Sequence, residues 1–162
     1  ITAMTLNSTS CVPDSTPVHV HQINEKPVRF FCPPNGSVDF PWTSYEDLLA
    51  ATGLSRQARR HFLEMTRKGE YGDALRIVQV PSGKTTIVPH YICQGIMGAL
   101  ETEGTLPERF QAQYTLGSCA AFQQIHKEMS PNERAQTLFV IVAREREEHD
   151  LPDASVSYGG KA

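Results

Sequence analysis

The stretch that decides the fold of this chain is PWTSYEDLLAATGLSRQARRHFLEMTRK, residues 41–68. It contains two serines, Ser44 and Ser55, each placed to cap a following helix, since a serine side chain accepts a hydrogen bond from the backbone of the first turn. Gly53 stands between them, where a glycine in the left-handed conformation ends one helix and begins a turn. The pattern predicts helices over 45–52 and 56–68.

Outside this stretch, alternating apolar and polar residues predict a β-hairpin on each side of it. The first hairpin covers 18–31, and the second joins 73–80 to 85–88 through Pro81-Ser82-Gly83-Lys84. Helical spacing of apolar residues follows, with predicted helices at 89–103, 108–129 and 131–149. The order predicts an α+β fold in which two β-hairpins frame a helix-turn-helix-like pair, followed by a carboxy-terminal helical extension.

The length of 162 residues is typical of a chain with one main domain. The longest apolar stretch, 138–143, is far shorter than the ~20 residues that span a bilayer, and the first residues lack the basic and apolar segments of a secretory signal. We therefore expect no membrane partner and a cytoplasmic location. The predicted parts are a flexible lead-in (1–16), the α+β domain (17–104), a helical extension suited to dimerisation (105–149) and a flexible tail (150–162).

The four cysteines, Cys11, Cys32, Cys93 and Cys119, are widely spaced and include no C-x-x-C pair. This spacing argues against a cysteine zinc site. In a chain of this length with an ordinary apolar fraction, we expect reduced thiols, which agrees with a cytoplasmic protein.

The net charge of −3 conceals an asymmetry along the chain. Residues 55–84 contain seven basic and three acidic side chains, whereas residues 101–153 contain five basic and ten acidic ones. A basic centre is typical of a segment that meets a polyanion, and the acidic second half indicates a different partner. An unevenly charged but purely solvated surface is the alternative.

Residues 47–63 also have the order of a DNA-reading helix-turn-helix, in which the amino end of the second helix meets the bases. Arg and Gln side chains there match guanine and adenine edges, and further basic residues bind phosphates. We therefore predict contact with double-stranded DNA. The predicted DNA-binding residues are Ser55, Arg56, Gln57, Arg59, Arg60, Arg67, Lys68 and Lys84.

One residue departs from that motif, because Arg59 occupies the position, four after the N-cap, that is normally buried and apolar. The helix can still bury Ala58, Phe62 and Met65, which rotates its apolar stripe by one residue. The segment is therefore either a variant helix-turn-helix or a plain surface pair of helices.

From His19 to about Leu100 the chain resembles Bro-N, the amino-terminal domain of phage antirepressors and baculovirus Bro proteins. The resemblance rests on the hairpin at 22–30, on the Pro41–Leu49 segment with Gly53-Leu54, on Arg59-Arg60, and on the hairpin at 77–88 and the helix at 91–100. It implies a DNA-associated transcription regulator or antirepressor of phage or plasmid type. The helices after Leu106 lie outside this pattern.

We predict no catalytic, metal or cofactor site, and therefore no enzyme. The Pro81–Thr85 segment lacks the first glycine of a P-loop, and His19, His21, His90 and Cys93 lack the spacing of a metal site. The alternative function is a protein-interaction module that modulates a host or phage regulator through the acidic carboxy-terminal helices, without touching DNA. In either case apolar stripes on these helices, which include Leu138 and Val142, are candidates for a homodimer contact.

Overall fold

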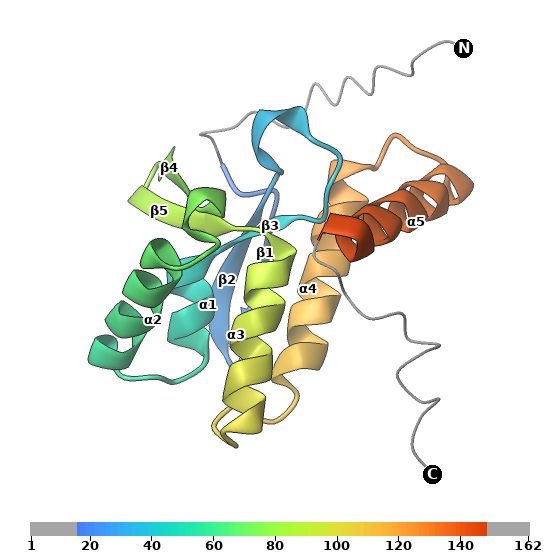
Figure 1. Ribbon diagram of the computed structural model, residues 1–162. Helices are drawn as coiled ribbons and strands as arrows, with labels where there is room; N and C mark the ends of the chain where they lie inside the picture. Colours follow the sequence, from blue (N-terminus) through green and yellow to red (C-terminus); the bar gives the residue numbers. More distant parts are fainter. Residues whose placement is uncertain (1–15, 149–162) are drawn as a thin grey trace. The chain divides into compact units, whose positions relative to one another are not determined.

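The computed structural model describes residues 16–148 (Figure 1). The predicted lead-in lies outside these residues except for Thr16, and the predicted tail lies wholly outside them. Within the described part the chain has the expected α+β fold, built on an antiparallel sheet of five strands with five α-helices.

The strands are β1 (His19–Ile23), β2 (Lys26–Phe31), β3 (Trp42–Ser44), β4 (Arg76–Val80) and β5 (Gly83–Val88). The helices are α1 (Tyr45–Ala51), α2 (Arg56–Lys68), α3 (His90–Thr102), α4 (Phe110–Ile125) and α5 (Pro131–Glu148), with short 3₁₀ turns η1 (Pro34–Gly36) and η2 (Gly72–Ala74). Both hairpins and all five helices are confirmed, with ends displaced by up to a few residues.

The strand β3 was not expected, and it joins the two hairpins into one sheet. The strand order is β1-β2-β3-β5-β4, with Phe30 opposite Thr43 on one side of β3 and Val88 opposite Thr43 on the other. A strand of three residues is too short to show an alternation of apolar and polar residues. The two hairpins therefore do not stand apart but share this central strand.

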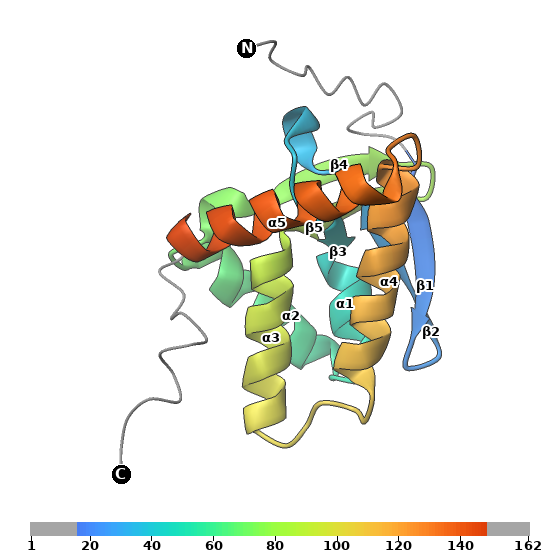
Figure 2. The ribbon, with the colours of Figure 1, turned by 90° about the vertical axis from the view of Figure 1, so that its right-hand side faces the viewer.

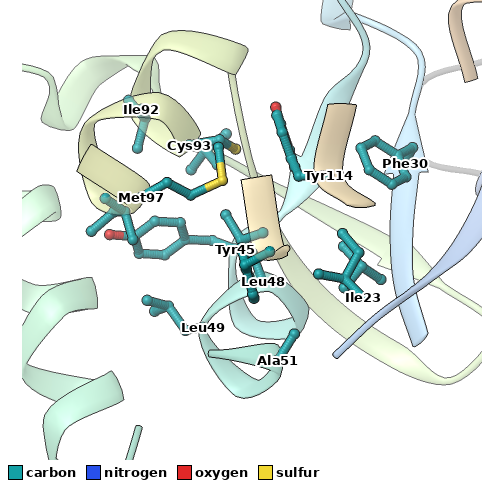
Figure 3. Packing of buried hydrophobic residues seen from close by; sticks show 14 of the residues in the cluster. Ile23, Phe30, Tyr45, Leu48, Leu49, Ala51, Ile92, Cys93, Met97 and Tyr114 are labelled. Carbon is teal, nitrogen blue, oxygen red and sulfur yellow. The ribbon is translucent and has the colours of Figure 1, made fainter. Parts of the chain in front are cut away.

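The sheet buries apolar side chains on both faces, because successive residues of a strand point in opposite directions. Phe30 belongs to a large cluster with residues of α1, α3 and α4, whereas Phe31 packs with Trp42, Ile87 and two valines of β4. In Figure 3, Tyr45 and Leu48 lie between α3 and the first hairpin. The helix α1 thus fills the centre of the larger cluster.

The turn of the first hairpin is attached to the carboxyl end of α1. Asn24 and Glu25 have φ of 51° and 64°, the left-handed pair that a two-residue hairpin turn requires. The Asn24 side-chain amide donates to the carbonyl of Ala51 at 2.8 Å, and the Lys26 ammonium donates to that of Ala50 at 3.2 Å. A cation at this position also complements the negative end of the helix dipole.

The helix α4 packs on β1 and β2 (Figure 2). Gly117 permits the close approach, since an added Cβ would lie 2.8 Å from Cε2 of Phe30 and 2.9 Å from Cβ of His21. The compact unit that contains the sheet extends to His126 and includes α4.

A second unit begins at Lys127 and contains α5. Its helix starts with a capping box formed by Ser130 and Glu133. The Ser130 hydroxyl accepts from the Glu133 amide at 3.2 Å, and the Glu133 carboxylate accepts from the Ser130 amide at 3.3 Å. This reciprocal pair satisfies two amides at the start of the helix.

We predict that Gly117→Ala lowers the free energy of unfolding by about 1–3 kcal/mol, because overpacking forces the neighbouring ring or the helix to move. Gly95→Ala on α3 is the matched control, since its added Cβ meets nothing within 4 Å. That change should raise stability by up to about 1 kcal/mol through helix propensity. Urea unfolding of both variants measures the difference, and equal effects would contradict the close approach of α4.

Candidate nucleic-acid interface

The two helices of the deciding stretch are capped as the sequence predicts. The Ser44 hydroxyl accepts from the Asp47 amide at 3.3 Å, and the Ser55 hydroxyl accepts from the Ala58 amide at 3.1 Å. Gly53, at φ 82°, turns the chain between α1 and α2. The second helix therefore begins at Arg56, with Ser55, Arg56 and Gln57 exposed at its amino end.

The carboxyl half of α2 is fixed to the start of α1 by a hydrogen bond between side chains. The oxygen atoms of the Tyr45 and Thr66 hydroxyls are 2.6 Å apart, and the Thr66 hydroxyl also lies 2.8 Å from the Phe62 carbonyl. When Thr66 donates to that carbonyl, the phenol donates to Thr66. Burial raises the pKa of Tyr45 to about 12, so this phenol keeps its proton at physiological pH.

None of the side chains of α2 is fully buried. The set of residues on its inner face differs from the predicted one at one member. Phe62 is half-buried as predicted, but Met65 is 51% exposed and Leu63 packs in its place. The prediction for Met65 was wrong because the chain turns the Arg59–Leu63–Thr66 side of the helix inward. The half-buried residues of the helix are Ala58, Arg59, Phe62, Leu63 and Thr66.

The side of α2 that lies about 110° around the helix from the middle of the half-buried side carries three exposed arginines, Arg56, Arg60 and Arg67. Their spacings of four and seven residues place them within about 40° of one another around the helix and spread them over about 16 Å of its length. We call these three residues the arginine stripe. A row of guanidinium groups on one exposed helix face is suited to phosphate oxygens.

Two further predicted residues of α2 are exposed beside this stripe rather than within it. Gln57 and Lys68 lie about 100° around the helix from Arg56 and Arg67. Glu64 is also exposed on this flank, one turn from each of Arg60 and Lys68. The strongest positive charge of α2 therefore follows the stripe.

Arg59 differs from the other predicted DNA-binding residues of α2, because it is turned toward the inner side of the helix. It is half-buried, and its Nε atom is shielded from solvent with no hydrogen-bond partner among residues 16–148. The common motif places an apolar residue here, and the fold does turn this position inward. The Nε–H donor of Arg59 therefore loses hydration without a compensating bond.

Lys84 lies on β5, at the end of the second hairpin that meets Arg29. The Nη1 atom of Arg29 is 3.4 Å from the Ser82 hydroxyl in that turn. The turn η2 connects α2 to the start of β4, which is the opposite end of this hairpin. About 10 Å of strand separates Lys84 from that end. The structure therefore does not bring Lys84 into the arginine stripe.

Long-range polar contacts, which the sequence did not predict, hold the amino end of α1. The Asp47 carboxylate accepts from the backbone amide, Nε and Nη2 of Arg29 at 3.1, 2.7 and 3.1 Å. The hydrogen bond to Asp47 is the largest cause that raises the pKa of Arg29 above its ordinary value. Spacing along the chain does not indicate this contact, because Arg29 and Asp47 are 18 residues apart.

The neighbouring carboxylate, Glu46, holds the edge of β5 in the same way. It accepts from the Thr86 amide at 2.9 Å and from the Thr85 hydroxyl at 2.9 Å. The Thr85 hydroxyl also lies 2.8 Å from that of Ser44, the cap of α1. These contacts orient the helix pair and are structural.

The histidines considered as metal ligands are placed in two separate environments. His19 and His21 are neighbours on β1, with Nε2 and Nδ1 3.2 Å apart, and His90 Nδ1 lies 2.8 Å from the Tyr114 hydroxyl. No group of three or more His, Cys, Asp or Glu side chains in the described part of the chain is arranged to hold a metal ion.

The pairing of His90 with Cys93 on α3 is not arranged to make a reactive thiolate. Burial raises the pKa of Cys93 to about 11 and lowers that of His90 to about 4. Activation of a thiol requires the opposite shift of its pKa.

The expectation of reduced cysteines is wrong at one position. Cys32 is disulfide-bonded, whereas Cys93 and Cys119 are free. Pairing depends on the distance between two side chains in the fold, which spacing along the chain does not give. The expected thiol at Cys11 lies outside the described residues.

Between Thr16 and Glu148, no helix is long and apolar enough to cross a membrane. No family model, no curated protein and no solved structure matches the chain. The Bro-N resemblance therefore stays a prediction.

We predict that Arg59→Met raises the free energy of unfolding by about 1 kcal/mol, because it removes a shielded N–H donor that lacks a partner while keeping the apolar stem. Arg60→Met, on the exposed stripe, should change stability by less than about 0.5 kcal/mol. Thermal or urea unfolding compares the two variants. A loss of stability in Arg59→Met would show that the guanidinium is stabilising.

The lowered pKa of His90 predicts a loss of stability in acid. The unfolded imidazole gains its proton near pH 6.5, but the folded one does so only near pH 4, so stability falls as the pH decreases between these values. The contribution of His90 between pH 7.5 and 4.5 is about 2 kcal/mol. Urea unfolding of His90→Gln should show a smaller decrease over this range than wild type, whereas His61→Gln, exposed on α2, should follow wild type.

Proposed function

We propose that this protein is a DNA-binding transcription regulator or antirepressor-like protein, and that the arginine stripe of α2 binds the phosphate backbone of duplex DNA. The observation that supports the proposal is the common face of Arg56, Arg60 and Arg67, exposed on a capped helix that follows α1 across Gly53. Ser55 and Gln57 at the amino end of α2 are the candidates for contact with bases.

The proposal assigns different roles to the predicted residues. Arg56, Arg60 and Arg67 supply phosphate contacts, and Lys68 adds positive charge at the end of the helix. Arg59 is half-buried and is not assigned a DNA contact. Lys84, on the hairpin beyond Arg29, is also left out of this surface.

Binding of the full chain to a random duplex, measured by fluorescence anisotropy across a salt series, tests the proposal. Each phosphate contact adds about 0.9 to the steepness with which log affinity falls against log salt. We expect Arg56→Gln plus Arg60→Gln to reduce that slope by about 1.8 and to weaken binding at low salt.

The matched control is Arg109→Gln plus Lys127→Gln, which removes the same charge from two exposed positions outside α2. If DNA were attracted only by overall charge, both double variants would lose affinity equally, and the assignment to α2 would fail. No binding of wild type at low salt would refute DNA contact altogether.

The alternative is an interaction module that acts on a regulator without touching DNA. It predicts no salt-dependent duplex binding by wild type, so the same titration separates the two functions. We also propose a phage or plasmid origin, from the Bro-N resemblance, and a cytoplasmic location, from the sequence. The disulfide at Cys32 counts against that location, since disulfides are rare in the cytosol.

A further inference from the structure

Two histidines lie side by side on β1, an edge strand of the sheet that packs against α4 (Figure 2). His19 and His21 are two residues apart on this strand, so their side chains point to the same face of the sheet. The Nε2 atom of His19 lies 3.2 Å from the Nδ1 atom of His21. We call these two residues the histidine pair.

The separation of these two nitrogen atoms is close to that of two imidazole ligands on one zinc ion. Zinc binds a histidine nitrogen at about 2.0–2.1 Å with tetrahedral angles, which places two such nitrogens about 3.3–3.4 Å apart. The ring centroids of the histidine pair are 5.4 Å apart, and the same zinc geometry requires about 5.2 Å. The two rings therefore need to move by only a few tenths of an ångström to bind one ion.

The metal-free pair is held by a hydrogen bond that a zinc ion can replace. One imidazole donates its proton to the facing nitrogen of the other ring. When the donor ring changes to its other tautomer, both facing nitrogens have a free lone pair. The ion then takes the place of the shared proton, and no charge has to leave the site.

Neighbouring residues fix the positions of both rings. On one side, a Cβ added to Gly117 of α4 would lie 2.9 Å from Cβ and 3.0 Å from Cγ of His21. His19 is opposite Phe30 in the sheet register, with ring centroids 6.3 Å apart. Because these contacts restrict the rings before an ion arrives, binding costs less side-chain entropy. Both histidines are only half-buried, so an ion from solvent can reach them.

The protonation of the pair also suits a metal ligand. Burial, together with the nearby charge of His21, lowers the pKa of His19 below its ordinary value. His19 is therefore neutral at physiological pH, which is the form that binds a metal ion. Imidazole nitrogens favour zinc, copper and nickel over magnesium and calcium, which prefer oxygen ligands.

From this geometry we infer that the histidine pair binds a zinc ion through Nε2 of His19 and Nδ1 of His21. Two positions of the tetrahedral ion remain for water or for a ligand from outside the chain, in contrast to a closed structural zinc centre with four protein ligands. The site lies away from α2 and does not depend on DNA contact.

Calorimetric titration of the full chain with zinc chloride tests the inference. A Cys119→Ser background removes an exposed free thiol, which is itself a zinc ligand. His19→Gln and His21→Gln should each weaken zinc binding by at least about 10-fold, since each removes one of the two ligands. His61→Gln, exposed on α2, is the matched control and should bind zinc as its parent does. No binding by the parent, or equal binding by all three variants, would overturn the inference.

Proton NMR of the imidazole rings tests the site without substituting its ligands. Zinc added to the same parent should shift the ring resonances of His19 and His21 and leave those of His61 and His90 unchanged. This measurement does not depend on whether the variants fold. Unchanged resonances of the histidine pair at a zinc concentration that saturates the calorimetric titration would place the ion elsewhere and refute the assignment.

Discussion

The amino end of α1 is the point on which the arrangement of the first unit depends. Two adjacent carboxylates there hold different parts of the sheet, Asp47 through Arg29 of β2 and Glu46 through the amide of Thr86 in β5. The positive end of the helix dipole stabilises both negative charges. Asp47 and Arg29 are partly shielded, with 19% and 23% of their side chains exposed, which makes this charge-assisted, two-pronged contact stronger than a surface ion pair.

The next consequence is the orientation of α2. Tyr45 immediately precedes these carboxylates, and its hydroxyl fixes Thr66 near the end of α2. At the other end of α1, the turn at Gly53 sets where α2 begins. Because α2 is held at both ends by α1, the position of its exposed arginines relative to the sheet is determined by the few residues that anchor α1. The local capping and turn residues and the long-range contacts thus both act on α1.

Local signals explain which parts of this fold are readable from the sequence. Ser44, Ser55 and Gly53 act within a few residues of the chain, so the bounds of α1 and α2 follow closely from them. The strand β3 was missed because its pairing partners are distant in sequence, and the packing of α4 on the first hairpin depends on Gly117, whose role is visible only against Phe30. For the candidate site, the sequence identified the basic helix but not which of its charges point away from the core, because Met65 is exposed and Leu63 and Thr66 turn inward instead.

The helix α2 combines an inner side that is only half-buried with a charged outer side. Its inner side offers Phe62 and Leu63, both only half-buried, and includes Arg59 in place of an apolar residue. Phe62 and Leu63 pack on the larger cluster, and the hydroxyl contact between Thr66 and Tyr45 adds a polar contact with α1. Among residues 16–148, the side chains of the arginine stripe take no part in these contacts. We therefore expect a helix attached in this way to keep its position when its outer charges change.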